Sequence, residues 1–326
     1  MDIKIGSLNC LHLSAKSDSE KVAQIARIIY EECFDIVALQ EVKSGGLDAI
    51  LNKLNPGRDR TKGKWAGCAD HNDYAFVWNT KHLTLPKTKL ANGQMRIAYP
   101  RVYNQYKRDP DLGRISFARP PFYGRFQTNW TGIPKVEIRL INAHIRFSKG
   151  KDGEEHAPTA NDLALRRFEY QALTKSIYYR VSDKVYGKAE GESSPTTAYT
   201  ILLGDYNMNL RESGAGSPYL GDLETVTISC GRDDKVIVAK QSELTTLKKP
   251  KDSDEQNDEQ NTEQKTQIYA NNYDHFSYDT NRFNGTRQRI SRVNTVEKYC
   301  HNDPQEHLKK VSDHTPIKMS LNIKKG

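Results

Sequence analysis

The sequence predicts a single domain of mixed α and β structure. Short apolar or alternating segments, typical of strands, recur from residues 3–8 to residues 315–321, so strand formation extends over nearly the whole chain. Amphipathic helical patterns lie between these strands, the strongest at residues 163–179. No apolar run approaches the ~20 residues that a membrane-spanning helix needs, so the chain is not expected to enter a membrane.

The first elements follow each other closely. Residues 3–8 alternate as a strand does, and Ser17, Asp18 and Ser19 offer caps for a helix whose apolar positions repeat at helical spacing. Residues 35–39 form a short apolar run, which is typical of a strand covered on both faces. A second helix is predicted at residues 47–54.

The remaining predicted elements are a strand at 74–78, a long loop at 92–111, strands at 122–126 and 136–143, a helix at 163–179, and strands at 200–203, 276–278 and 315–321. Two segments contain too few apolar residues to offset the entropy of ordering them: 187–197 and 248–267. Strands continue after each segment. Both are therefore interpreted as flexible surface excursions from one domain that spans residues 1–326.

The charge and the cysteine content indicate which kind of binding partner and which cellular compartment to expect. The chain has a formal net charge of +8 and a pI near 9.0, which favours polyanionic partners. Its five cysteines are scattered, odd in number and contain no CxxC pair, so a disulfide framework is not expected. The N-terminal residues alternate as a strand does and show no export signal. These features indicate a cytoplasmic protein, and they leave its oligomeric state open.

Polar residues follow or precede several of the predicted strands, at Asn9, Gln40–Glu41, His144, Gly204–Asn207, Tyr273–His275 and Ser312–His314. If the strand ends converge on one edge of a sheet sandwich, these side chains meet in one pocket. Each motif alone has a simpler interpretation as a solvated strand end, a turn or a cap. The functional interpretation depends on their joint occurrence in this order.

The ordered set resembles the signature of the deoxyribonuclease I-like endonuclease/exonuclease/phosphatase superfamily, over residues 9 to 314. The resemblance implies an α+β fold: a four-layered α/β sandwich of two mostly antiparallel sheets flanked by helices. It also implies a metal-dependent phosphodiesterase. Phosphodiester hydrolysis builds negative charge on the phosphoryl and leaving oxygens, which a hard divalent cation held by carboxylates stabilises.

By this resemblance, Glu41 and Asp313 are metal ligands and Asn9 completes the polar shell, with Mg²⁺ as the expected cofactor and Mn²⁺ as an alternative. Asp205 would orient or deprotonate the attacking water, and Asn207 would hold the nucleophile or a phosphate oxygen. Asp274 would pair with His314 at the scissile phosphate.

His144 would face the leaving group as an acid or a hydrogen-bond donor. Deoxyribonuclease I-like members place a glutamate beside this histidine, at the start of the strand that is here 74–78. This sequence has none there, so Asp73 or Asn72 is the expected substitute.

Arginines point to a phosphate-rich substrate. Arg119 precedes two prolines and resembles the superfamily's arginine that approaches the substrate phosphate, whereas Arg125 is equally well explained as a solvated strand residue. Basic and aromatic residues alternate in the preceding loop, at Arg96, Tyr99, Arg101, Tyr103, Tyr106, Lys107, Arg108 and Arg114. A second cluster comprises Arg282, Arg287, Arg289 and Arg292. Such patterns suit a nucleic-acid backbone, and ordinary solubilising charge is the simpler explanation.

The leading hypothesis is a DNA endonuclease with nucleic acid as its partner. A phosphatase acting on a phosphorylated lipid or sugar is the alternative enzyme, and a catalytically inactive binding module is the alternative of another class. Inactivity would be marked by loss of the residue types at Glu41, Asp205 or His314, and all three are present.

Overall fold

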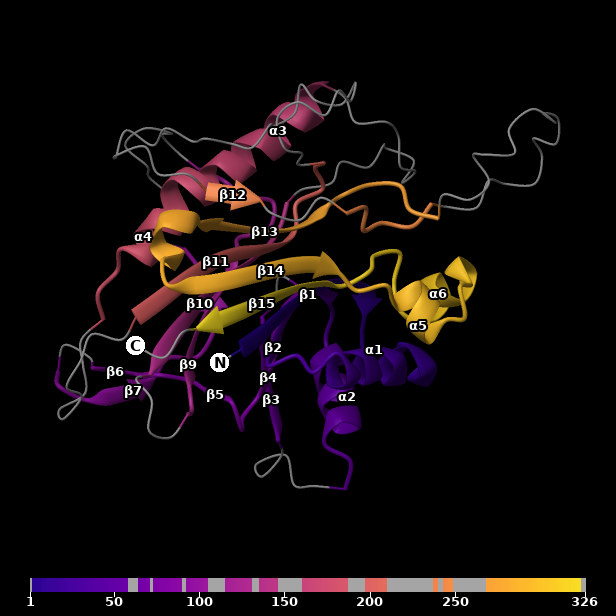
Figure 1. The fold of residues 1–326 in the computed structure, drawn as a ribbon, viewed down its shortest axis with the longest axis horizontal. Helices are drawn as coiled ribbons and strands as arrows, with labels where there is room; N and C mark the ends of the chain where they lie inside the picture. The colour runs from indigo at the N-terminus through magenta and orange to yellow at the C-terminus, as the bar shows by residue number, and fades with distance from the viewer. Residues whose placement is uncertain are drawn as a thin grey trace.

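The computed structural model describes most of the chain, and the description below applies to residues 2–57, 64–70, 73–89, 92–104, 115–130, 135–145, 160–186, 197–209, 237–239, 243–248 and 268–323. Two large β-sheets form the centre of this part of the molecule (Figure 1).

The first sheet has six strands in the order β14 (Thr286–Arg292), β15 (Ile317–Ile323), β1 (Asp2–Leu13), β2 (Ile36–Val42), β4 (Tyr74–Asn79) and β3 (Trp65–Ala69). Only the β1–β2 pair is parallel among its described pairings. In that pair Asn9 lies opposite Gln40. The polar residues near the C-terminal ends of these two strands are therefore at the same edge of the sheet.

The second sheet has the order β12 (Ile237–Ala239), β13 (Asp274–Asp279), β11 (Thr197–Asp205), β10 (Val136–His144), β9 (Phe122–Thr128) and β5 (Leu83–Thr84), and β8 (Arg101–Val102) also pairs with β9. Here the parallel pair is β10–β11, with His144 opposite Asp205. The antiparallel neighbour β13 places Asp274 opposite Asp205. A small separate sheet joins β6 (Lys87–Lys89) and β7 (Met95–Ile97).

Three hydrophobic clusters define four layers. The central cluster fills the space between the two sheets and includes Phe76, Phe126 and Ile201. A second cluster packs α1 (Ser19–Glu31), α2 (Gly46–Leu54), α5 (Thr295–Tyr299) and the end of α6 (Pro304–Lys310) on the outer face of the first sheet. A third packs α3 (Ala160–Gln171), the π-helical turn η1 (Ala172–Tyr178) and α4 (Tyr179–Ser182) on the second sheet. The predicted four-layered α+β sandwich is confirmed.

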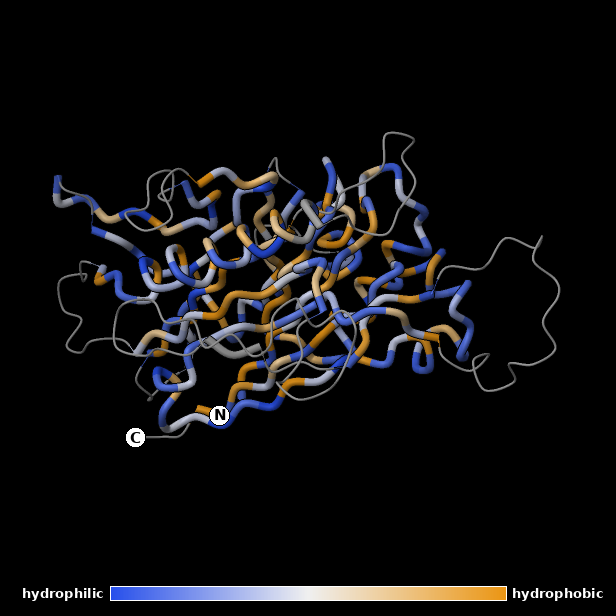
Figure 2. Tube along the Cα trace, turned by 90° about the horizontal axis from the view of Figure 1, so that it is seen from above, coloured by the Kyte–Doolittle hydropathy of each residue, from blue (hydrophilic) through white to orange (hydrophobic). Residues whose placement is uncertain are grey.

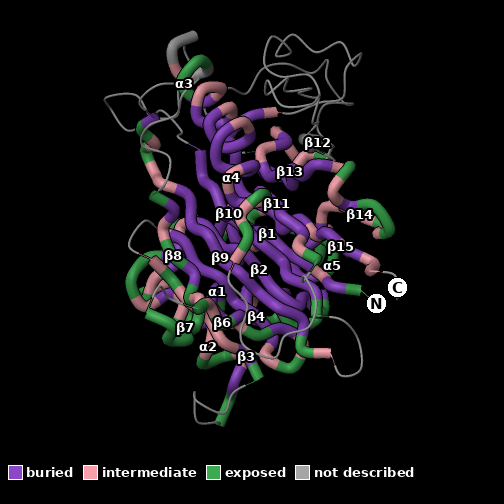
Figure 3. The backbone as a smooth tube through the Cα atoms, turned by 90° about the vertical axis from the view of Figure 1, so that its left-hand side faces the viewer, coloured by how far each residue is buried: buried purple, intermediate pink, exposed green. Residues whose placement is uncertain are grey.

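Burial explains why the apolar runs become central strands. The five residues of β2 from Ile36 to Gln40 are buried, as expected for a strand covered on both faces. Figure 2 shows hydrophobic segments through the body of the molecule. Figure 3 shows the central strands β1, β2, β10 and β11 as mostly buried and β7 as exposed. The rigid centre of the sandwich thus supports the strand ends that carry the polar motifs.

Several element predictions need correction. The segment at 92–111 is not wholly loop, because its described part contains β7 and β8. The helix predicted at 163–179 changes to π-helical geometry at Ala172. The predicted excursions at 187–197 and 248–267 lie outside the described residues, except for Thr197 at the start of β11 and Lys248, so both remain predictions.

Candidate active site

One pocket of about 650 Å³ opens where the strands of both sheets end. Its lining includes Asn9, Glu41, His144, Asp205, Asn207, Asp313, His314 and Arg119, which are eight of the nine predicted site residues. The ninth, Asp274, lies directly behind His314. Six strand-end motifs that are far apart in sequence therefore meet in one place, as the sequence predicts.

Asp205 is the centre of the site. It is 1% exposed, and its Oδ1 accepts a hydrogen bond from the backbone N–H of Asn207 at 2.9 Å. Its Oδ2 accepts the side-chain amide of Asn9 at 3.0 Å and lies 3.6 Å from His144 Nε2 and 3.7 Å from His314 Nε2. Burial raises the pKa of Asp205 to about 7, against the opposing effect of positive charge on His314.

His314 and Asp274 form a buried pair. His314 Nδ1 is 2.7 Å from Asp274 Oδ2, and both side chains are at most 8% exposed. Burial disfavours a charged imidazole, but the carboxylates of Asp274 and Asp205 outweigh it and raise the pKa of His314 well above its ordinary value. The pair therefore places a positive charge beside Asp205, with Nε2 directed toward it.

His144 has the opposite electrostatic surroundings. Burial, followed by the positive charge of Arg119, holds the pKa of His144 well below its ordinary value, so the imidazole is neutral. Its backbone N–H donates to the hydroxyl of Tyr74 at 2.8 Å. Among the described residues, Nδ1 has no hydrogen-bond partner.

Asp73, the expected carboxylate partner of His144, is not its partner, and the expected amide partner Asn72 stays a prediction. Asp73 instead forms an ion pair with Lys43, and Asn72 lies outside the described residues. His144 is consequently better suited to donate a hydrogen bond than to supply a proton as an imidazolium.

Carboxylates that could hold a divalent cation lie close together at the mouth of the pocket. The amide nitrogen of Asn9 donates both to Glu41 Oε1 at 3.2 Å and to Asp205 Oδ2, which brings two carboxylates together at one point. Mg²⁺ is usually bound through one or two carboxylates and keeps several waters. The described residues contain no group of three or more His, Cys, Asp or Glu arranged around a metal position. Glu41, Asp205 and Asp313 are the carboxylates of this pocket that could contribute to such a site.

The other predicted ligands and phosphate-binding residues surround this point. Asp313 lines the pocket and accepts the hydroxyl of Ser312 at 3.2 Å. Arg119 is half-buried in the pocket wall. Asn207 adopts a left-handed conformation with φ 50°, and its amide donates to the carbonyl of Ile145 at 2.8 Å. The side-chain amide of Asn207 therefore ties the end of β11 to the residue that follows β10, in addition to any contact with substrate.

The sequence did not predict three side chains of the site. Two of them hold site residues in place, and the third contacts Glu41, a proposed metal ligand. Arg166 of α3 is buried and donates to the carbonyl of Asn207 at 2.8 Å, and Tyr74 supports His144. His12 contacts Glu41, with Nδ1 2.7 Å from Oε2. Arg166 and Tyr74 lie in a helix and a strand that the sequence predicts. The residue patterns of these elements do not indicate which site residue each side chain contacts. His12 carries no sequence signal, because it reaches the site through an irregularity in β1.

Other members of the motifs hold the structure together. His275 points to the opposite face of β13 from Asp274, and its Nε2 lies 2.9 Å from the carbonyl of Met208. Gln40 donates to the side-chain carbonyl of Asn142 at 2.7 Å, which links the two sheets beneath the pocket. Arg125 is neither solvated nor part of the pocket lining. It is buried and forms a two-pronged ion pair with Glu137.

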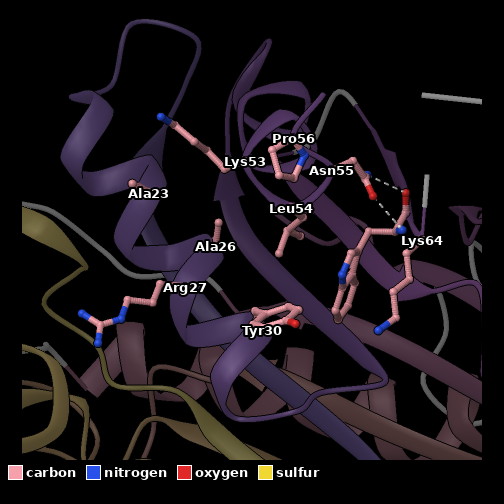
Figure 4. A pocket seen from close by; sticks show the side chains of 10 residues that line it. Ala23, Ala26, Arg27, Tyr30, Lys53, Leu54, Asn55, Pro56 and Lys64 are labelled. Atoms are coloured by element: carbon pink, nitrogen blue, oxygen red, sulfur yellow. Dashed lines mark hydrogen bonds between the residues drawn. The ribbon is translucent and has the colours of Figure 1, made fainter. Parts of the chain in front are cut away.

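Two further hollows lack this chemistry. The larger, about 690 Å³, lies beside α1 and α2 and is shown in Figure 4; none of its lining residues is His, Asp or Glu. There the side chain of Asn55 hydrogen-bonds the backbone of Trp65, while Tyr30 and Leu54 contribute apolar surface. The smaller, about 280 Å³, is lined by arginines and tyrosines that include Arg96, Tyr99 and Arg101. Of these three hollows, only the strand-end pocket is lined by histidine and acidic side chains.

Comparison with known proteins identifies the fold. No protein-family profile and no curated protein sequence matches the chain. Solved structures do match over nearly the full length. An endonuclease/exonuclease/phosphatase protein from Bacteroides vulgatus has a TM-score of 0.54 and 10% identity, covering 99% of this chain and 100% of its own.

A humanized TDP2 from D. rerio has a TM-score of 0.53 and 11% identity, covering 98% and 99% of the two chains. D. rerio TDP2 in complex with a single-strand DNA product has a TM-score of 0.50 and 10% identity, covering 98% and 99%. The chain therefore shares its fold with endonuclease/exonuclease/phosphatase and TDP2 structures, as the strand-end motifs indicate. In the described part of the chain, no helix combines the length and apolar character that crossing a membrane requires.

Proposed function

We propose that this chain is a metal-dependent phosphodiesterase that cuts DNA as an endonuclease. The observation that carries the proposal is the single pocket in which Asn9, Glu41, Asp205, His144 and the Asp274–His314 pair meet, on a fold shared with endonuclease/exonuclease/phosphatase proteins. Carboxylates for a hard cation, a positively charged histidine and a neutral histidine are the groups that hydrolysis of a phosphodiester needs.

Each side chain has a position that fits one task. Asp205 is held at both oxygens and lies between the two histidines, so it is placed to orient a water molecule and accept its proton. His314, held by Asp274, presents positive charge to a phosphoryl oxygen. His144, with Arg119 in the same pocket, is placed to donate a hydrogen bond on the leaving-group side.

Glu41, with Asp313 in the same pocket, would hold Mg²⁺ or Mn²⁺, and the amide nitrogen of Asn9 would position the Glu41 carboxylate. When bound, such an ion supplies Lewis-acid stabilisation of the negative charge on the phosphoryl group. The absence of a serine or cysteine nucleophile paired with a base among the described pocket residues agrees with direct attack by water.

Nucleic acid is favoured as substrate by charge and by structural likeness. The chain carries a net charge of +8, and Arg96 and Arg101 are exposed beside Tyr99. One of the similar structures holds a single-strand DNA product. A phosphorylated lipid or sugar remains the alternative substrate class, and the assay below separates the two.

The test is cleavage by the purified full chain with Mg²⁺, in parallel on supercoiled plasmid, single-stranded DNA, RNA and inositol phosphates. Plasmid nicking that disappears in excess chelator and returns with Mg²⁺ or Mn²⁺ is the expected result. Glu41→Ala should abolish it at low metal concentration, whereas Glu31→Ala, an exposed carboxylate of α1, should not. Full cleavage in chelator would refute metal dependence, and activity on inositol phosphates alone would refute the choice of DNA.

A further inference from the structure

His12 makes two contacts to a single oxygen of Glu41. Its backbone N–H donates to Oε2 at 3.2 Å, and its imidazole Nδ1 lies 2.7 Å from the same oxygen. The other oxygen, Oε1, faces the pocket, where it accepts the amide of Asn9 at 3.2 Å and lies 4.0 Å from His144 Nε2. The carboxylate of Glu41 is thus fixed in its plane, with one oxygen occupied and the other directed inward.

The backbone of β1 is distorted to make these contacts. The register between β1 and β2 shifts between Asn9 and Leu13, which is a bulge. Leu11 and His12 have φ angles of 45° and 57°, and Glu41 has 57°. Non-glycine residues in this left-handed region cost on the order of 1–3 kcal/mol each and persist where the surroundings determine them.

The surroundings of the bulge are built to hold it. Lys21, a buried residue of α1, reaches across and donates to the carbonyl of Leu11 at 2.8 Å. The side-chain oxygen of Asn9 accepts the backbone N–H of Leu11 at 3.0 Å. A regular strand would direct these residues elsewhere, so the bulge is what brings His12 to Glu41.

Stability does not explain this arrangement. The side chain of His12 is 60% exposed, and exposed ion pairs contribute little to the free energy of folding. Three left-handed residues instead destabilise the fold locally. Strain of this kind clusters at functional sites, where it orients a group.

We propose that His12 is a positioning residue that orients the carboxylate of Glu41 to bind a divalent cation through Oε1. This inference rests on the proposed metal-dependent function. Groups that hydrogen-bond a metal-ligating carboxylate fix its direction, and their loss typically lowers metal affinity 10–100-fold. His12 acts through Glu41 and has no assigned contact with substrate.

The test measures Mn²⁺ binding to the full chain without DNA, by the electron paramagnetic resonance signal of free Mn²⁺. His12→Ala should weaken Mn²⁺ affinity about tenfold or more. His12→Asn should restore most of it, because the asparagine amide nitrogen occupies the place of Nδ1 and asparagine tolerates positive φ. His301→Ala is the matched control, since His301 is also exposed with a φ of 49° and lies outside the pocket.

Nicking assays on the same variants separate this inference from the proposed function. The Mg²⁺ concentration for half-maximal nicking should rise about tenfold in His12→Ala, with turnover at saturating Mg²⁺ near that of the unaltered chain. Equal or tighter Mn²⁺ binding by folded His12→Ala, in a chain that nicks DNA with metal, overturns the role of His12 alone. An unaltered chain that neither binds Mn²⁺ nor nicks DNA overturns both.

Discussion

Two of the histidine–aspartate pairs in the described part of the chain join Nδ1 to a carboxylate in different surroundings. His314 and Asp274 are buried together at the pocket, and His314 also faces Asp205. His82 and Asp35 pair through the same nitrogen, Nδ1, but the histidine is 42% exposed and lies outside the pocket. The pairing alone therefore does not define a functional histidine. Its second nitrogen must also face a reacting group.

This contrast gives a matched test of the mechanism. Replacing His314 with alanine should lower turnover by a factor on the order of 10² or more, because a positioned charge-stabilising group is lost. Replacing both His314 and Asp274 should cost little more than the worse single change, since the two act as a unit. His82→Ala should retain specific activity.

Activity per folded molecule, with thermal unfolding measured in parallel, provides the check. A well-folded His314→Ala protein that cleaves at a near-normal rate would contradict the assigned role, and so would an equal loss in His82→Ala.

At the level of elements, the junction of β10 and β11 depends on one glycine. Gly204 has a φ of 137°, and a Cβ built there would lie 1.9 Å from the carbonyl oxygen of Ala143, its partner across the parallel pair. Gly204→Ala should therefore lower the free energy of unfolding by roughly 3 kcal/mol or more and displace Asp205.

Gly285→Ala separates the cost of the steric clash at Gly204 from the cost of its positive φ. Gly285 also has a positive φ, 79°, but no atom lies within 4 Å of its added Cβ. Its cost should be only about 1 kcal/mol, the conformational penalty alone. Equal losses in the two variants, measured by chemical denaturation, would show that the close approach of β10 to β11 is unimportant.

A second element-level feature is the attachment of α6. His307 is buried, with Nε2 2.7 Å from the hydroxyl of Thr295 in α5 and Nδ1 2.8 Å from the carbonyl of Ser312, which leads to His314. Burial lowers the pKa of His307 to about 4 from an ordinary value of 6.5. The folded chain therefore holds this histidine neutral where the unfolded chain protonates it.

The sign of the pH dependence follows. The contribution of His307 is fully present above pH 6.5 and is lost as the pH falls toward about 4, because the unfolded state then binds more protons. The free energy of unfolding should fall by roughly 3 kcal/mol over this range. His301→Asn removes an exposed histidine and should show the same fall with pH. Denaturation between about pH 4 and 8 measures the slope. An NMR titration that gives His307 an ordinary pKa would contradict the prediction.

At the scale of the whole molecule, positive charge should govern the encounter with nucleic acid. Replacing Arg101 and Arg108 with alanine should weaken DNA binding and reduce the slope of log affinity against log salt by about 1 for each phosphate that an arginine no longer neutralises. Arg101 is exposed beside the smaller hollow, and Arg108 lies outside the described residues. Arg27→Ala, a surface change on α1, is the control. An unchanged salt slope, measured by fluorescence anisotropy, would favour small phosphorylated substrates.

The second arginine cluster is a weaker candidate for the same role. Arg282 forms ion pairs with Asp183 and Asp279, and Arg292 lies 3.8 Å from the ring centroid of Tyr269. Both are engaged within the protein. Arg287 and Arg289 are exposed on β14, at the edge of the first sheet. Charge on an edge strand also prevents pairing with another chain, which explains these two residues without a ligand.

The sequence predicted the central strands and the residues at their ends because both signals are local. A buried strand requires an apolar run, and a polar residue directly after it reaches the sheet edge. It could not predict β7, β8 or β14, whose exposed positions carry charge and hide the alternating pattern. Such edge strands form because a neighbour offers hydrogen bonds, and their own residues do not indicate this.

The pairing of side chains within the site was harder to predict from the sequence than the strands that carry them. The Asp274–His314 pair was predicted through the resemblance and is present in the structure, whereas Asp73 was wrongly offered to His144. Asp73 has a φ of 68°, and its carboxylate meets Lys43. His12 could not be found, because the bulge in β1 overrides the regular alternation of a strand. Partners of this kind depend on backbone irregularities that no local residue pattern encodes.

The position of β15 has a consequence for synthesis on the ribosome. This strand lies between β14 and β1, so β1 waits for residues 317–323 before it gains its second neighbour in the sheet. His314, just upstream, likewise joins Asn9, Glu41 and Asp205 only at that stage. A nascent chain would therefore hold most of the pocket but lack its positively charged histidine. If the proposed function holds, cleavage would begin only after His314 has been synthesised, which limits cleavage of nucleic acid by incomplete products.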